Sequence, residues 1–160
     1  MEKTITKVIE ALRHRSEKLT FAESCTGGLL SSQVTSLPGV SDVFMGSCVT
    51  YSNRMKREVL GVPGSILSTM GAVSRPTALH MAKGVKALTD TDWAVSITGI
   101  AGPTGGTDTK PVGTVCFAIV GPGFEWSSME SFTGSRIEVQ QSSAKFALET
   151  LDKVLSGELK

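Results

Sequence analysis

The chain has 160 residues, of which 40% are hydrophobic and 19% charged, and its formal net charge at pH 7 is +1. This composition excludes a disordered chain, and a domain of this length buries roughly 70% of its unfolded surface in a core. The near-neutral charge argues against nucleic acid or a membrane as partner, since both demand a basic face. We therefore predict one domain over residues 1–160.

The cysteines Cys25, Cys48 and Cys116 are odd in number, far apart and without C-x-x-C spacing. This pattern disfavours a disulfide framework and a zinc site, and reduced thiols are typical of a cytoplasmic protein. The first 18 residues lack the apolar run of a signal peptide, and no apolar stretch reaches the ~18 residues of a membrane span. We expect a cytoplasmic protein without a metal or cofactor.

Hydrophobic periodicity and turn residues predict the elements in chain order. They are a helix over 3–17, a strand over 19–23, a helix over 26–36, a strand over 44–51, a short helix N-capped by Asn53 that carries Lys56 and ends near Gly61, a helix from Ser74 to about 88, a strand over 93–99, a loop over 99–113, a hairpin of strands 114–120 and 124–132, and a last helix from Ser135.

In the last helix, apolar side chains are predicted to line one face: Ile137, Ala144, Leu148, Leu151 and Leu155. Helices alternate with strands through the first hundred residues, which favours a largely parallel sheet covered by helices on both faces. The late hairpin adds an antiparallel element. The expected fold is therefore α/β, a three-layer α/β/α sandwich with a mostly parallel, mixed central sheet. Ligands of such folds bind at the strand ends, where the loops converge.

The segment FAESCTGG places Ser24 between a predicted strand and a predicted helix. As an N-cap, Ser24 would only satisfy backbone donors. As a nucleophile, it would stand beside unpaired helix-start N–H groups near Thr26, Gly27 and Gly28, which suit an oxyanion or a phosphate. The G-x-S-x-G elbow is not satisfied, because Ala22 and Thr26 occupy its glycine positions. Both interpretations stay open from these residues alone.

A serine nucleophile needs a base, and His14 and His80 both fall within predicted helices outside any motif. A buried lysine can serve instead when burial lowers its pKa from ~10.4 toward 7–8. Lys56 in YSNRMK is the candidate, with Tyr51, the only tyrosine, five residues earlier to pass a proton or orient the lysine. The alternatives are a solvated helix lysine and a half-buried strand aromatic. Cys25 is a rival nucleophile without a paired histidine.

The loop over 99–113 is rich in Gly, Pro and Thr but is neither a Walker A nor a Rossmann motif. It is either a flexible crossover or a backbone nest that cups a phosphate or sugar. Ser135 and Glu138 form a capping box that opens the last helix. Arg136 in the first turn is unfavourable for the helix dipole but well placed to bind an anion.

Six motifs in this order resemble the CinA C-terminal domain family over about residues 6–155: AESCTGG, VTYSNRMK, GAVS, VSITGIAGPTGG, KPVGTV and FTGSR. Two-domain members of that family carry a further N-terminal domain, so the chain is expected to be a stand-alone version. The resemblance implies a serine amidohydrolase that converts nicotinamide mononucleotide to nicotinate mononucleotide and ammonia, a step of pyridine-nucleotide salvage. It also implies that Ser24 is the nucleophile, with Tyr51 and Lys56 as its partners.

With this resemblance, the expected mechanism is acyl transfer, with Lys56 as base and N–H groups near Thr26 and Gly27 holding the oxyanion. The nucleotide is expected to bind to a set of small, polar and basic residues: Glu23, Thr26, Gly27, Gly28, Asn53, Gly102, Gly105, Gly106, Lys110 and Arg136. Family members usually carry an arginine four residues after the one that matches Arg136, and often an aspartate before it. Here these positions hold Gln140 and Ser135.

Two other functions remain open from the sequence. The chain could be a non-catalytic nucleotide-binding module on the same fold, or a structural subunit. A homo-oligomer is expected in either case.

Overall fold

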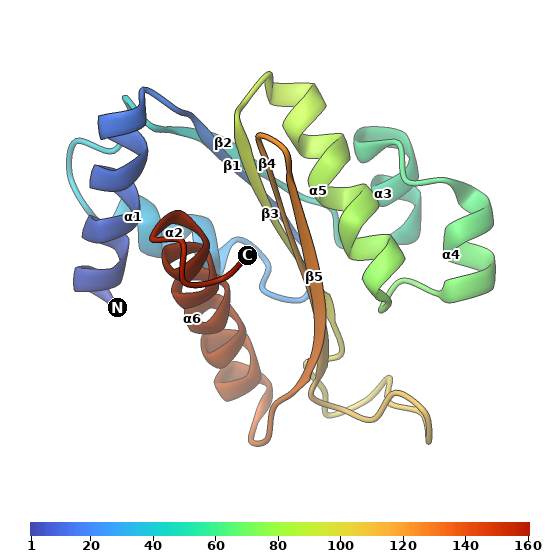
Figure 1. The fold of residues 1–160 in the computed structure, drawn as a ribbon. Coiled ribbons are helices and arrows are strands. Elements are labelled where there is room, and N and C mark those ends of the chain that lie inside the picture. Colours follow the sequence, from blue (N-terminus) through green and yellow to red (C-terminus); the bar gives the residue numbers. More distant parts are fainter.

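The computed structural model describes all residues, 1–160, and contains six helices and five strands (Figure 1). In chain order they are α1 (Glu2–Arg15), β1 (Leu19–Glu23), α2 (Leu29–Thr35), β2 (Phe44–Val49), α3 (Asn53–Leu60), α4 (Gly64–Met70), α5 (Arg75–Thr89), β3 (Trp93–Gly99), β4 (Thr114–Gly121), β5 (Phe124–Ser131) and α6 (Arg136–Leu155). None of these helices is both long and apolar enough to cross a membrane.

The five strands form one mixed sheet in the order β2-β1-β3-β4-β5. Strand β1 pairs in parallel with β2 and β3, whereas β4 is antiparallel to both β3 and β5. Four strands therefore run in one direction and only β4 opposes them, as predicted from the helix–strand alternation and the late hairpin. The strand order reverses direction at β1, because the chain leaves it first toward β2 and later returns on its other side as β3.

Helices cover both faces of the sheet (Figure 1): α1, α2 and α6 lie on one face, and α3, α4 and α5 on the other. The sheet residues alternate accordingly, so that Leu19 and Phe21 pack toward α1 and α6 while Ala22 packs toward α5. The three-layer α/β/α sandwich expected from the sequence is confirmed.

Close packing of α3 on α5 positions the helix that carries Lys56. A Cβ atom added at Gly84 of α5 would lie 1.9 Å from the carbonyl oxygen of Leu60, which ends α3. Only glycine at this position allows the backbones of α3 and α5 to approach so closely. Gly84 stands inside a helix, where glycine is locally unfavourable, and in exchange it lets the end of α3 pack directly on α5.

Two predictions about helix ends were wrong. Helix α2 begins at Leu29 rather than at residue 26, because Gly27 and Gly28 adopt left-handed φ values of 60° and 101° that no α-helix contains. The N-cap of α3 is Ser52, whose side chain accepts from the N–H of Met55, and not Asn53.

Ile137 does not join the apolar face of α6 but is 63% exposed. It lies about 200° around the helix from the buried Val139. Helix α4 was not predicted, because none of its residues is buried and it therefore leaves no hydrophobic periodicity in the sequence.

Candidate active site

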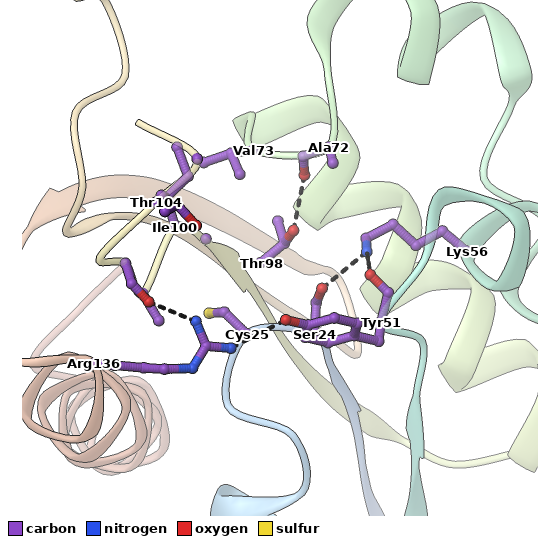
Figure 2. A pocket seen from close by; sticks show the side chains of 14 residues that line it. Ser24, Cys25, Tyr51, Lys56, Ala72, Val73, Thr98, Ile100, Thr104 and Arg136 are labelled. Carbon is purple, nitrogen blue, oxygen red and sulfur yellow. Dashed lines mark hydrogen bonds between the residues drawn. The ribbon is translucent and has the colours of Figure 1, made fainter. Parts of the chain in front are cut away.

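A crevice of about 300 Å³ opens at the carboxyl ends of β1 and β3, where the strand order reverses. Ligands of open α/β sheets bind at such switch points because the loops on either side diverge there. Ser24 directly follows β1 and Ile100 directly follows β3. The lining residues are Ser24, Cys25, Tyr51, Lys56, Ala72, Val73, Thr98, Gly99, Ile100, Ala101, Gly102, Thr104, Gly105 and Arg136 (Figure 2).

The amine of Lys56 points at the hydroxyl of Ser24 (Figure 2), with 2.9 Å between Nζ and Oγ. Lys56 Nζ also donates to the carbonyl oxygens of Thr50 at 2.8 Å and Tyr51 at 3.2 Å. A carbonyl oxygen can only accept, so these two contacts take two hydrogens of the amine. In a neutral amine the remaining group is the lone pair, which then faces the Ser24 hydroxyl. This is the arrangement that a general base requires.

Burial lowers the pKa of Lys56 to about 8. The side chain is 1% exposed and has no carboxylate partner, so its hydrogen bonds to two carbonyls and one hydroxyl only partly replace the hydration that the charged form loses. A solvated helix lysine, the alternative left open by the sequence, is therefore excluded. Burial also raises the pKa of the Cys25 thiol to about 12. The thiol stays protonated at neutral pH, which argues against Cys25 as the nucleophile.

Glu23 is the last residue of β1, and its fully buried carboxylate holds the turn that follows. It accepts from the hydroxyl of Thr26 at 2.7 Å and from the N–H groups of Gly28 and Leu30, each at 3.1 Å, and of Ser31 at 2.9 Å. The hydroxyl of Ser31 donates to it as well. The carboxylate thus takes the place of an N-cap for α2, and the donors at the start of this helix are not available to a ligand.

Four predicted substrate-binding residues therefore lie outside the cavity: Glu23, Thr26, Gly27 and Gly28. The Gly27 N–H donates to the carbonyl of Ser24 at 3.0 Å and cannot hold an oxyanion. The N–H groups of Cys25 and Thr26, by contrast, donate no hydrogen bond to another residue. Of these two residues only Cys25 lines the crevice, so its N–H is the donor available beside Ser24.

Gln140 and Ser135, the two departures from the family pattern, have separate roles. The side-chain amide of Gln140 donates to the carbonyl oxygen of Cys25 at 2.8 Å, so α6 contacts the Ser24 turn directly. Ser135 N-caps α6, and its hydroxyl accepts from the N–H of Glu138 in the predicted capping box. Neither residue lines the cavity.

Tyr51 and Arg136 meet at the mouth of the crevice (Figure 2), where the Arg136 guanidinium donates to the Tyr51 phenol at 3.0 Å. A second guanidinium nitrogen donates to the carbonyl of Gly102 at 2.7 Å. The phenol of Tyr51, which is 63% exposed, thus binds Arg136, whereas only its main-chain carbonyl contacts Lys56. Arg136 ties the 100–113 loop to α6 and keeps further N–H groups free to bind an anion.

The structure brings Gly102 and Gly105 to the cavity, but not Gly106, Lys110 or Asn53. The amine of Lys110 donates to the carbonyl of Met70 at 2.8 Å, which ties the loop to the end of α4. Asn53 is exposed in the first turn of α3.

Sequence reasoning did not name the side chains of the mostly apolar wall of the crevice, which come from the segment after α4 and from the end of β3 with the loop that follows: Ala72, Val73, Thr98, Ile100, Ala101 and Thr104. The Thr98 hydroxyl joins these two segments through the carbonyl of Ala72 at 2.8 Å. These residues lie within the motifs GAVS and VSITGIAGPTGG, which marked the two segments but not the side chains that line the crevice. His14 and His80 stay outside the cavity, and no three His, Cys, Asp or Glu side chains converge.

These features define an α/β protein with a buried serine–lysine pair at the switch point of its sheet. The chain belongs to the CinA C-terminal domain family, whose model matches residues 1–155. It is 45% identical over 151 residues to a CinA-like protein of Prochlorococcus marinus and 47% identical over 159 residues to one of Thermotoga sp.. These matches cover 92% and 98% of the chain but only 35% and 38% of the relatives, so the chain spans about a third of their length.

Solved structures of similar length share the whole fold. A CinA superfamily protein of Klebsiella pneumoniae superposes with a TM-score of 0.93 at 35% identity, and 97% of each chain is covered. The competence/damage inducible protein CihA of Agrobacterium tumefaciens gives a TM-score of 0.92 at 38% identity, covering 97% of this chain and 94% of its own.

Proposed function

We propose that the chain hydrolyses the carboxamide of nicotinamide mononucleotide to give nicotinate mononucleotide and ammonia. The observation that carries this proposal is the 2.9 Å contact between the buried amine of Lys56 and the hydroxyl of Ser24 inside a crevice. Membership of the CinA family and the AESCTGG and VTYSNRMK motifs support the choice of substrate, which the geometry alone does not specify.

In the first half-reaction, neutral Lys56 takes the proton of Ser24 while Oγ attacks the amide carbon. The negative charge that develops on the amide oxygen is stabilised by the N–H group of Cys25, which lines the crevice and donates to no other residue. The Lys56 ammonium then gives its proton to the departing nitrogen, and ammonia leaves as the tetrahedral intermediate collapses to an acyl-enzyme.

In the second half-reaction, Lys56 is again neutral and takes a proton from water, which attacks the acyl carbon. The returning proton restores the Ser24 hydroxyl, and nicotinate mononucleotide is released. The net reaction consumes one water and leaves the enzyme unchanged. The same base serves both steps because a single amine lies within reach of the reacting oxygen.

The rest of the crevice suits a flat ring that carries an anionic tail. Val73 and Ile100 provide an apolar wall for the pyridine ring, opposite the polar corner formed by Ser24 and Lys56. Arg136 at the mouth binds the phosphate, together with backbone N–H groups of the loop around Gly102 and Gly105. Tyr51 contributes twice, because its phenol orients Arg136 and its carbonyl holds Lys56.

The test is ammonia release from nicotinamide mononucleotide, with nicotinate mononucleotide identified by chromatography and Ser24→Ala as the control. We expect one ammonia per nicotinate mononucleotide formed. Thermal stabilisation of the protein by nicotinamide mononucleotide without release of ammonia would instead favour the non-catalytic nucleotide-binding module. Neither turnover nor stabilisation would reject the substrate.

A further inference from the structure

The charged side chains that line the crevice are both basic: Lys56 and Arg136. No carboxylate lies on its wall, because Glu23, the acidic residue nearest to Ser24 in the chain, binds the start of α2 instead. We propose that the Ser24–Lys56 pair is also a binding site for a carboxylate, so that the carboxylic acid product inhibits the enzyme more strongly when Lys56 gains a proton. This inference rests on the proposed function, which supplies the identity of that carboxylate, nicotinate mononucleotide.

The protonation state of Lys56 sets the direction of its hydrogen bond to Ser24 (Figure 2). Two hydrogens of the amine go to the carbonyl oxygens of Thr50 and Tyr51 in either state, because a carbonyl oxygen only accepts. In the neutral amine, the lone pair faces Ser24 Oγ at 2.9 Å and accepts its hydrogen. In the ammonium, a third hydrogen takes that place and donates to Oγ. The hydroxyl hydrogen of Ser24 is then free to turn into the crevice.

These two states suit different ligands. With Lys56 neutral, Ser24 presents an activated oxygen to an amide carbon, as hydrolysis requires. With Lys56 charged, the Ser24 hydroxyl can donate to one carboxylate oxygen, and the N–H of Cys25, which donates to no other residue, is available for the second. The positive charge of the ammonium, one hydrogen bond away, attracts the anion further. The same pair thus attacks an amide in one state and holds the corresponding acid in the other.

Hydrolysis itself ends in the second state. Deacylation releases the carboxyl group of the product from Ser24 Oγ, so this group starts within hydrogen-bond reach of that oxygen. A carboxylic acid is a stronger acid than a lysine ammonium by several pKa units, so its proton passes to Lys56. The amide and one water have then become ammonia, a carboxylate and a proton held by Lys56. The next turnover requires that both the product and this proton leave.

Burial lowers the pKa of Lys56 to about 8, and the groups around it leave the amine free to titrate there. The Cys25 thiol is the titratable neighbour that acts on this pKa, and its own pKa of about 12 keeps it neutral. The Glu23 carboxylate binds the start of α2, and the Tyr51 phenol binds Arg136. Helices α3 and α5 carry further titratable side chains, all outside the crevice: Arg54, Arg57, Glu58, Arg75, His80, Lys83 and Lys86.

The test measures the binding of nicotinate mononucleotide to the wild-type protein by calorimetry at pH 7, 8 and 9, where the carboxylate stays ionised. Because the ammonium form binds better, the dissociation constant should rise about 5-fold to 10-fold from pH 7 to pH 9. Binding near pH 8.5 should also take up about half a proton or more per ligand, measured in buffers of different ionisation enthalpy. A ligand held by its phosphate alone would take up none.

Three variants assign the effect to the Ser24–Lys56 pair. Lys56→Met removes the charge, so it should weaken binding at pH 7 about tenfold or more and abolish the proton uptake. Ser24→Ala removes one donor, so it should weaken binding about 3-fold to 10-fold while the uptake persists. Lys3→Met makes the same change as Lys56→Met at an exposed lysine of α1 and should behave like wild type. If Lys56→Met does not fold, the proton uptake of wild type still decides.

The same measurements separate this inference from the proposed function. If wild type releases no ammonia from nicotinamide mononucleotide but takes up a proton with nicotinate mononucleotide, the proposed function fails and the carboxylate site stands. If wild type releases ammonia but binds nicotinate mononucleotide equally well at pH 7 and pH 9, the proposed function stands and this inference is overturned. The absence of measurable binding at pH 7, or an unchanged pH dependence in Lys56→Met, would overturn it as well.

Discussion

Two walls of the crevice differ in how firmly they are held. In the 24–28 turn, one buried carboxylate, Glu23, binds the following backbone and side chains, and Gln140 holds the turn from α6. In the 100–113 loop, residues 103–109 are all exposed, and the side chains that hydrogen-bond the loop to α6 and to the end of α4 are Arg136 and Lys110. The sequence had predicted ligand contacts from both segments.

Under the proposed function, this difference would separate the segment that carries the nucleophile from the segment that binds the nucleotide. A nucleophile and its oxyanion donors must be held before the reaction, because reorientation during the reaction raises the barrier. A loop that binds the nucleotide tail can instead adjust to it and needs only a few fixed groups, such as Arg136. Changes in the turn should therefore lower kcat, whereas changes at the loop should raise KM.

The largest effect should come from the nucleophile. Ser24→Ala removes the attacking oxygen and should lower kcat by about 10³-fold or more while KM changes little. Steady-state ammonia release checks this, with Ser32→Ala, an exposed serine of α2, as a matched control. A Ser24→Ala variant with near-native turnover would reject Ser24 as nucleophile.

Replacing Lys56 should have the next largest effect on turnover, and Lys56 should also make kcat/KM rise with pH. The working form is the neutral amine, and burial lowers the pKa of Lys56 to about 8, so kcat/KM should rise about tenfold per pH unit up to about pH 8 and then level off. Lys56→Met should lower kcat by about 10²-fold to 10⁴-fold and abolish this rise. A flat profile for wild type between pH 6 and 8 would contradict a lysine base.

Arg136 should affect binding rather than turnover. Arg136→Met removes the guanidinium between Tyr51 and Gly102, so KM should rise about 10-fold to 100-fold with kcat within about threefold. Initial rates over a range of nucleotide concentrations check this, and Arg54→Met on the exposed face of α3 serves as the control. A fall in kcat at constant KM would place Arg136 with the turn instead.

Glu23 should affect stability and have the smallest direct effect on the reaction, because its role is to hold the turn. In Glu23→Gln the amide NH₂ would face N–H donors that now meet a carboxylate oxygen, so the free energy of unfolding should fall by about 1–3 kcal/mol. Denaturant unfolding measures this loss, with the exposed Glu10→Gln of α1 expected to change stability by less than about 0.5 kcal/mol. Equal stability of the two variants would contradict the anchoring role.

Much of the fold followed from local patterns. Alternating helical and strand periodicities predicted the layers, and turn residues placed the ends of β3 at Trp93 and Gly99. Helix α4 was missed because its side chains stay at the surface, where nothing imposes a period. The start of α2 was misplaced because two consecutive left-handed glycines extend the turn, and the N–H of the second, Gly28, binds the carboxylate of Glu23 rather than a helix carbonyl.

For the candidate site, the sequence predicted some residues and not the contacts of others. Ser24 and Lys56 could be proposed because a strand-to-helix turn and a lack of suitable histidines pointed to them. The contacts of Glu23 and Lys110 could not be predicted, because no motif reveals them. Glu23 binds the start of α2, and Lys110 binds the end of α4. Gln140 stood out only as a departure from a pattern, without a contact to explain it.

The sequence by itself determined the layered fold, the family and the residue types able to attack an amide, because these depend on periodicity and on chemistry written into short segments. Only the tertiary structure decided that the Lys56 amine is buried against Ser24 and that Glu23 points away from it. The lowered pKa of a lysine and the anchoring of a turn depend on atoms brought together from distant segments, and these distances exist only once the sheet and its helices have packed.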